Sequence, residues 1–165
     1  MTLYVIRHGI AEDAGPGTPD EARRLTPVGR TRMRGVARGM RALGVGIDVL
    51  LTSPLVRARE TAEIVAEVYG NIALREVPAL ASGVAPAETV RALRPFARRA
   101  RVAIVGHEPG LSGIASLLLT GSTEGVRIAL KKGAVIALEV ETLGPRSDAT
   151  LRWLLTAKQL RRIGK

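Results

Sequence analysis

The two histidines of this 165-residue chain stand in equivalent places, each directly after a run of apolar residues. His8 follows LYVI and Arg7 in the motif RHG, and His107 follows VAIV in the motif GHEPG. Because open α/β sheets place ligand sites at the carboxyl ends of their strands, we expect the two imidazoles to meet there. A neutral imidazole is a nucleophile at neutral pH, and a protonated imidazole stabilises negative charge.

Two arginines accompany these histidines. Arg7 precedes His8, and Arg57 lies in SPLVRARET, after a second strand-like run. Guanidinium groups fit the oxygens of a phosphoryl group, and a helix starting at Ser53-Pro54 would add a positive dipole end. Gly9 is expected to permit close approach of the backbone to the phosphate. The pattern therefore predicts phosphoryl transfer through a histidine.

The same residues predict no metal and no other cofactor. The sequence has no cysteine, no Gly-Lys-Ser/Thr phosphate loop and no closely spaced His/Asp/Glu cluster. Arginines and an imidazolium suffice to balance phosphoryl charge. Structural roles are the simpler interpretation for four other polar residues: helix caps for Thr26 and Ser53, a solvated side chain for Arg59, and an acid at a helix N-terminus for Glu108.

Strand-like and helical segments alternate, which predicts a three-layer α/β/α domain with a mostly parallel central sheet. We expect one domain over residues 1–165, and a solvated tail in KQLRRIGK. A loop containing Gly144-Pro145 should join the last two strands. The expected strands are 2–7, 48–52, 73–77, 101–106, 134–140 and 150–155. The expected helices are 27–43, 55–68, 87–99, kinked or divided at Pro95, and 109–119.

The net charge of +10 raises the question of nucleic-acid binding, which the composition disfavours. Arginine outnumbers lysine 21 to 4, a bias that genomic base composition can produce, and aromatic residues make up only 2% of the chain. A positive field that attracts anionic substrates or an acidic protein partner is the milder interpretation. No membrane-spanning stretch or signal peptide is recognisable, so we expect a cytoplasmic protein without membrane association.

The three motifs RHG, SPLVRARETA and GHEPG, in this order after three strands, resemble those of the histidine phosphatase superfamily, which has the phosphoglycerate-mutase-like fold. Within it, LTPVGRTRM and GHEPGLS resemble the SixA branch of small phosphohistidine phosphatases. The resemblance implies that His8 is the phosphorylated nucleophile and Arg7 a phosphate ligand. Arg57 and His107 match the second arginine and the second catalytic histidine.

The segment from Pro78 to Arg99 favours the SixA interpretation. Mutases and many broad phosphatases of the superfamily carry an acid here, in an insertion, to protonate an alkoxide leaving group. This segment is short and has no acidic residue before Glu88. The imidazole of a phosphohistidine leaves far more easily, and a missing insertion predicts an open site. We therefore expect a histidine-phosphorylated protein as the substrate.

Two alternatives stay open. Glu108 occupies the place where the acid-phosphatase branch has its proton donor, and Glu12 lies close to the first motif, so either could support hydrolysis of small phosphate esters. The chain would then be a small-molecule phosphomonoesterase. A non-catalytic module that recognises phosphate is the third hypothesis, and the presence of two histidines and two arginines in the motifs argues against it.

Overall fold

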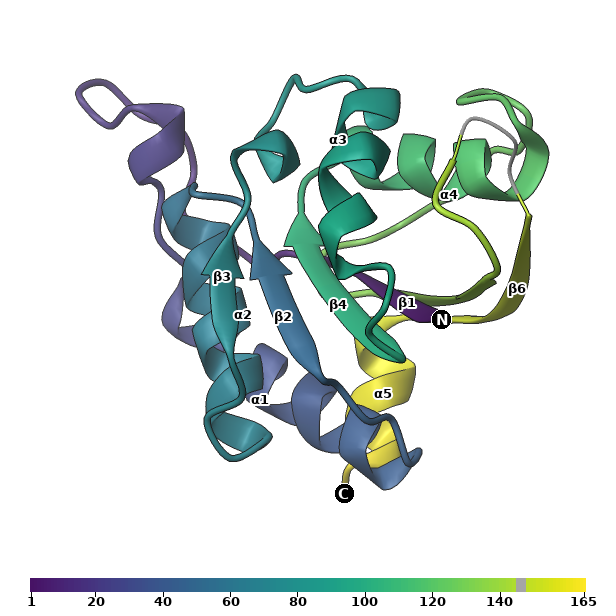
Figure 1. Ribbon diagram of the computed structural model, residues 1–165. Helices are drawn as coiled ribbons and strands as arrows, with labels where there is room; N and C mark the ends of the chain where they lie inside the picture. The colour runs from purple at the N-terminus through teal and green to yellow at the C-terminus, as the bar shows by residue number, and fades with distance from the viewer. Residues whose placement is uncertain (145–147) are drawn as a thin grey trace.

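A six-stranded sheet forms the centre of the protein (Figure 1). The computed structural model describes residues 1–144 and 148–165, so Pro145 of the expected Gly144-Pro145 loop lies outside the described residues. The strand order is β3-β2-β4-β1-β5-β6. The first four of these pair in parallel, whereas β5 and β6 are antiparallel to their neighbours. The strands are β1 (Thr2–Arg7), β2 (Val49–Thr52), β3 (Leu74–Glu76), β4 (Arg101–Gly106), β5 (Val135–Val140) and β6 (Ala149–Leu155).

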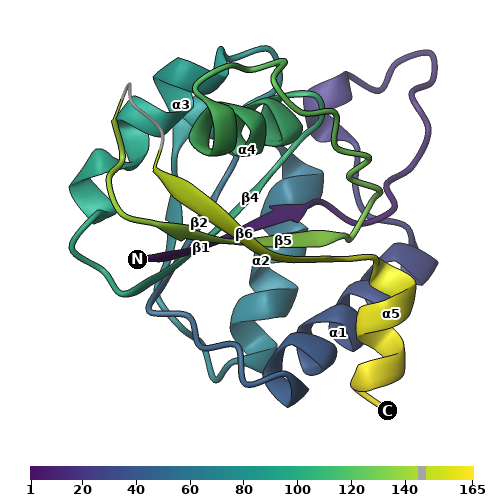
Figure 2. The same cartoon turned by 90° about the vertical axis from the view of Figure 1, so that its right-hand side faces the viewer.

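Helices cover both faces of this sheet, as Figure 2 shows edge-on. This explains why the central strands read as nearly continuous apolar runs, since both of their faces are buried. One core cluster lies beneath α3 (Pro86–Leu93) and α4 (Gly110–Thr120). The other lies beneath α1 (Pro27–Ala42), α2 (Val56–Val68) and α5 (Ala157–Ile163). The predicted three-layer architecture with a mostly parallel sheet is confirmed.

Two helix boundaries follow the local signals in the sequence. The side chain of Thr26 accepts a hydrogen bond of 2.9 Å from the backbone N–H of Gly29, and Pro27 opens α1, as predicted. The expected 87–99 helix is divided: α3 ends at Leu93, and a short 3₁₀ turn over Arg94–Phe96 contains Pro95. Proline has no N–H to continue the helical ladder, which explains this division.

The prediction of a solvated tail was wrong. Residues Ala157–Ile163 form α5, which begins with a capping box between Thr156 and Gln159 and packs against α1. Leu160 is fully buried in this contact. The backbone of Leu160 comes so close to Gly39 that a Cβ there would lie 2.0 Å from the Leu160 carbonyl oxygen. A single buried leucine in a polar segment gave too weak a periodic signal to reveal the helix.

The carboxyl ends of β2, β4 and β1 are adjacent in the sheet order and lie at one edge. The chain segment after β1 and the 3₁₀ turn Asp20–Ala22 lie beyond the end of β2 in Figure 1. This topology brings the three sequence motifs together.

In the described part of the chain, no helix has the length and apolar character needed to cross a membrane.

Candidate active site

The two histidines meet at this edge, as predicted. Their ring centroids are 5.1 Å apart with an angle of 50° between the ring planes. Only 5% of His8 and 4% of His107 is exposed. His8 continues directly from β1, and His107 from β4, so the register of two paired strands fixes their separation.

The tautomer and charge of His8 suit a nucleophile. Its Nδ1 lies 2.7 Å from the carbonyl oxygen of Gly9, which can only accept, so Nδ1 carries the proton and Nε2 keeps its lone pair. Burial lowers the pKa of His8 to about 3; the hydrogen bond to Gly9 opposes this, and the nearby His107, Arg57 and Arg7 add to it. The imidazole is therefore neutral at physiological pH.

His107 is held by a different contact. Its Nε2 lies 2.8 Å from the hydroxyl oxygen of Ser53, while its buried Nδ1 has no protein partner. Burial, and after it the charge of Arg57, lowers the pKa of His107 to about 4. The imidazole is thus neutral before an anion binds. A phosphoryl group beside it would favour the protonated form.

Ser53 is not the helix cap that the sequence suggested. Helix α2 begins at Val56, and Leu55 is its N-cap residue. The fully buried Ser53 accepts a hydrogen bond of 3.2 Å from the Leu55 N–H, and its own proton is free to be donated to Nε2 of His107. Ser53 therefore links the second motif to the third.

The two predicted arginines complete the cluster. The Nη1 atom of Arg7 donates to the carbonyl of Leu130 at 2.8 Å, and only 4% of Arg57 is exposed. Among the described residues, four buried side-chain N or O atoms have no hydrogen-bond partner: Nε of Arg7, Nε of Arg57, Nδ1 of His107 and the hydroxyl of Tyr69. Three of these belong to this site. Such unpaired nitrogens are suited to an anion with several oxygens.

Asp20 accepts hydrogen bonds from the guanidinium of Arg57, a contact that the sequence motifs did not predict. The Nη2 atom of Arg57 donates to the Asp20 carboxylate at 2.9 Å, and Nη1 donates to the Asp20 carbonyl at 2.6 Å. A hydrogen bond from Arg23, followed by one from Arg57, lowers the pKa of Asp20, so the group is a carboxylate at neutral pH. Only its place in TPDEARR, a polar loop between two motifs, hinted at this contact.

The expectation of an open site is therefore corrected. No insertion follows β3, but the loop before α1 places a carboxylate against Arg57, and both histidines are almost fully buried. A buried guanidinium is stable only with a counterion or hydrogen-bond acceptors, and the neighbouring loop supplies both.

Thr61, within the motif SPLVRARETA, positions the loop that follows β1. Its hydroxyl accepts a hydrogen bond of 3.1 Å from the Gly9 N–H and donates one of 2.7 Å to the Arg57 carbonyl. Both backbone groups of Gly9 are thus engaged, its carbonyl with His8 and its N–H with Thr61. A Cβ at Gly9 would lie 2.7 Å from the Met33 side chain, so glycine is needed here for packing against α1.

Of the two candidate acids, only Glu108 lies beside the site, where it lines a small hollow together with His107. Glu108 receives hydrogen bonds from the N–H and the hydroxyl of Ser112, at 2.9 and 2.6 Å, which places both carboxylate oxygens at the start of α4. This is the helix-terminal arrangement predicted for it. Glu12 is exposed. Arg59 forms an ion pair of 3.0 Å with Glu76 on the surface, so it lies outside the site.

No metal centre is visible from side-chain placement. Across residues 1–144 and 148–165, no group of three or more His, Cys, Asp or Glu side chains is arranged to hold a metal ion. Whether the reaction is independent of metals stays a prediction.

Comparison with known sequences agrees with the geometry. The family model for the histidine phosphatase superfamily (branch 1) matches residues 3–82, which include the first two motifs. An uncharacterized protein of Picosynechococcus sp. (strain ATCC 27264 / PCC 7002 / PR-6) is 38% identical over 144 residues, covering 84% of each chain. The chain belongs to the histidine phosphatase superfamily.

Solved structures of this superfamily share the fold. The protein histidine phosphatase SixA complexed with tungstate superposes with a TM-score of 0.81 at 20% identity, covering 97% of this chain and 99% of that one. A phosphoserine phosphatase from Entamoeba histolytica, in complex with 3-phosphoglyceric acid, gives a TM-score of 0.69 at 16% identity, covering 96% and 98%. The predicted phosphoglycerate-mutase-like fold of SixA type is confirmed. At these identities the likeness does not specify the substrate.

Proposed function

We propose that this protein is a phosphohistidine phosphatase that works through a phosphorylated His8. The observation that carries this proposal is the state of His8: a neutral imidazole with Nε2 unprotonated, 5.1 Å from the ring of His107 and close to two arginines. The preferred substrate is a histidine-phosphorylated protein, and a small phosphate ester is the alternative substrate.

In the first step, Nε2 of His8 attacks phosphorus. The new P–N bond to His8 forms while the P–N bond of the substrate breaks. The departing imidazole, which carries a proton on its other nitrogen, takes the bonding electron pair and leaves as a neutral ring. Arg7, Arg57 and His107 hold the phosphoryl oxygens during the transfer. The Asp20 carboxylate must release Arg57 before a phosphoryl oxygen can take its place.

In the second step, water attacks the phosphorus of phospho-His8. A P–O bond forms, the P–N bond breaks and its electron pair returns to Nε2, while the proton lost by water leaves with phosphate or solvent. The hydrogen bond from Nδ1 to Gly9 keeps the ring orientation constant through both steps.

The placement of Glu108 supports phosphohistidine over an ester. An alkoxide leaving group needs a proton donor, and both oxygens of Glu108 are already bonded to Ser112. An imidazole leaving group has no such need. The cluster also requires no metal in this scheme, and we propose a cytoplasmic location consistent with such a substrate.

The test is phosphate release from a chemically phosphorylated histidine peptide and from p-nitrophenyl phosphate and a sugar phosphate, measured side by side. We expect faster release from the phosphohistidine peptide, a phospho-His8 intermediate detectable after rapid quenching, and loss of both in His8→Ala.

Other outcomes lead to other functions. Faster hydrolysis of the esters, lost in Glu108→Gln, would assign the protein to small-molecule phosphate esters. Binding of the phosphorylated peptide without any release of phosphate would leave a recognition module.

A further inference from the structure

The positive charge of the chain is concentrated in segments that contain no acid. Residues 22–47, 125–138 and 149–165 carry 15 of the 25 lysines and arginines, and none of the 15 aspartates and glutamates. These segments contain α1, the loop before β5, and α5, and Figure 2 shows α1 and α5 packed side by side below the sheet. Helices α1 and α5 and residues 131–133 of the loop before β5 thus lie together on one side of the molecule.

Two hollows lie along this side and share the side chains of Arg32, Lys158 and Arg161. The first, of about 330 Å³, lies next to the active-site loop and is also lined by Lys131 and Lys132. The second, of about 360 Å³, continues along the two helices. It adds three further basic residues: Arg38, Arg162 and Lys165. We call the two hollows together the basic groove.

No acidic or aromatic side chain lines either hollow of the basic groove. None of its lysines and arginines takes part in the ion pairs found among the described residues. Elsewhere on α1 the arginines do have partners, as Arg30 does with Glu60 and Arg34 with Glu67. Like charges gathered without counterions raise the free energy of the fold and create a strong positive potential.

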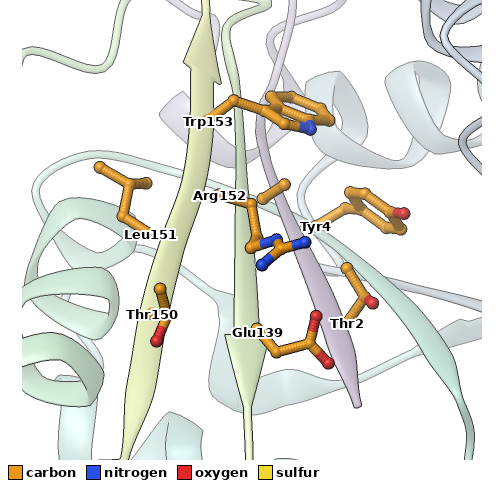
Figure 3. Close-up of a pocket in the computed structure, with 8 residues that line it drawn as sticks. Thr2, Tyr4, Glu139, Thr150, Leu151, Arg152 and Trp153 are labelled. Atoms are coloured by element: carbon orange, nitrogen blue, oxygen red, sulfur yellow. The ribbon is translucent and has the colours of Figure 1, made fainter.

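The lysines show that this gathering is specific. A base composition that enriches arginine does not enrich lysine, yet all four lysines of the chain line the basic groove. A larger hollow, shown in Figure 3, lies over β1, β5 and β6 and differs from the basic groove in its lining. It is lined by Arg152 and Glu139, which have opposite charges, and by the rings of Tyr4 and Trp153. Of these two surfaces, only the basic groove has a charge of one sign.

The basic groove is continuous with the active site. Gly9, the residue after the nucleophile, lines its first hollow. The Gly133 N–H donates to the carbonyls of Arg7 and His8, at 3.1 Å each, and the Leu130 carbonyl accepts from Arg7. Lys131 and Lys132 stand between these two anchor points. A partner whose phosphohistidine reaches His8 would therefore lay its neighbouring surface along these lysines.

We propose that the basic groove docks an acidic protein surface that surrounds the phosphohistidine of the substrate. This inference rests on the proposed function for the identity of the phosphoryl donor. An acidic protein fits better than a nucleic acid, because the groove offers no aromatic ring for base stacking. Attraction between the opposite charges acts mainly on encounter and on KM, and weakens as salt screens it.

The experiment compares two phosphohistidine peptides of equal length, one flanked by aspartate and glutamate and one flanked by serine and glutamine. We expect wild type to hydrolyse the acidic peptide with a kcat/KM about tenfold higher at about 0.01 M salt, with the difference lost near 1 M. The groove variant R32E/K158E/R162E should lose this preference through KM and keep its kcat on the neutral peptide.

A matched control separates the groove from net charge. The variant R75E/R91E/R98E makes the same change of charge at exposed sites on β3, on α3 and after α3, and should keep the preference. Circular dichroism and an unfolding curve check that both variants fold. The inference is overturned if wild type has equal kcat/KM for the two peptides, or if both variants lose the preference for the acidic peptide to the same extent. Either outcome leaves the proposed function intact.

A binding measurement keeps the inference testable without catalysis. Fluorescence anisotropy with the unphosphorylated acidic peptide should show binding to wild type and the control variant, and weaker binding to the groove variant. If neither phosphopeptide is hydrolysed, the proposed function fails, and this measurement still decides whether the groove binds acidic peptides. Tighter binding of a duplex oligonucleotide than of the acidic peptide near 0.15 M salt would overturn the inference in favour of nucleic acid.

Discussion

The active site and the basic groove use positive charge in opposite ways. In the site, Arg57 is almost fully buried, and Thr61 and Asp20 bond to its backbone carbonyl and its guanidinium. In the groove, side chains such as Lys131 and Lys158 are exposed, and the described residues give them no ion pair. A buried charge acts at short range on one group, whereas an exposed set acts at long range and is screened by salt. Substitutions in the site should thus have large, individual effects, and those in the groove small, cumulative ones.

Replacing a buried site arginine should give the largest effect. Arg57→Ala removes one of the two guanidinium groups expected to hold the phosphoryl oxygens, and we expect kcat/KM for phosphohistidine to fall about 10²–10³-fold. Arg59→Ala is the matched control on the same helix, because Arg59 is half-exposed and pairs with Glu76. Similar losses in the two variants would remove the distinction between buried and exposed arginines.

The buried histidines should make stability depend on pH. Burial lowers the pKa of His8 to about 3 and of His107 to about 4, so between these values and 6.5 the unfolded chain binds protons that the folded chain does not. The contribution of the two neutral histidines to the free energy of unfolding is therefore complete above pH 6.5 and is lost as the pH falls. The free energy of unfolding should drop by roughly 1.4 kcal/mol per histidine for each pH unit within this window.

Urea unfolding at a series of pH values measures this dependence. The double variant H8N/H107N should show a much flatter profile between pH 4 and pH 6.5. The carboxylates of Asp20 and Asp48, whose pKa values are lowered from 3.8, lose their contribution to stability mainly below pH 4. An unchanged profile in the double variant would show that the histidines are not buried as described.

Thr61 should affect the position of His8 and leave the charge of the site unchanged. Thr61→Val leaves the Gly9 N–H without its acceptor, and we expect kcat to fall about tenfold with little change in KM, since a displaced nucleophile reacts more slowly. Thr61→Ser should restore kcat. Ser116→Ala removes another buried hydroxyl, which bonds to Ser122 and Val126 at the far end of α4, so it should destabilise the fold without lowering kcat. A loss of kcat in that control would point to general destabilisation instead.

The smallest effect is expected at Asp20. Because its carboxylate pairs with Arg57, Asp20→Ala should strengthen competitive inhibition by inorganic phosphate about threefold to fivefold. Glu21→Ala is the control, since it removes a neighbouring exposed acid from the same loop. Weaker inhibition in Asp20→Ala would mean that Asp20 helps to hold Arg57 in place for phosphate.

The sequence alone was sufficient for the sheet and for the cluster of motif residues. Apolar runs such as LYVI and VAIV mark the buried strands, and residues that directly follow parallel strands must lie at one edge. The order of strands and motifs along the chain therefore predicts that His8, His107 and Arg57 lie together. Thr26-Pro27 likewise determined where α1 begins, because capping is a local interaction.

Contacts between distant segments were decided only by the tertiary structure. The pairing of Asp20 with Arg57, the bond between Ser53 and His107, and the docking of α5 against Gly39 join residues that have no regular spacing in the chain. The same holds for the basic groove, since its lysines come from a loop and a helix that are separate in sequence. Local patterns determine strands and helix starts because their hydrogen bonds are local, whereas counterions and docking partners depend on the packing of the whole fold.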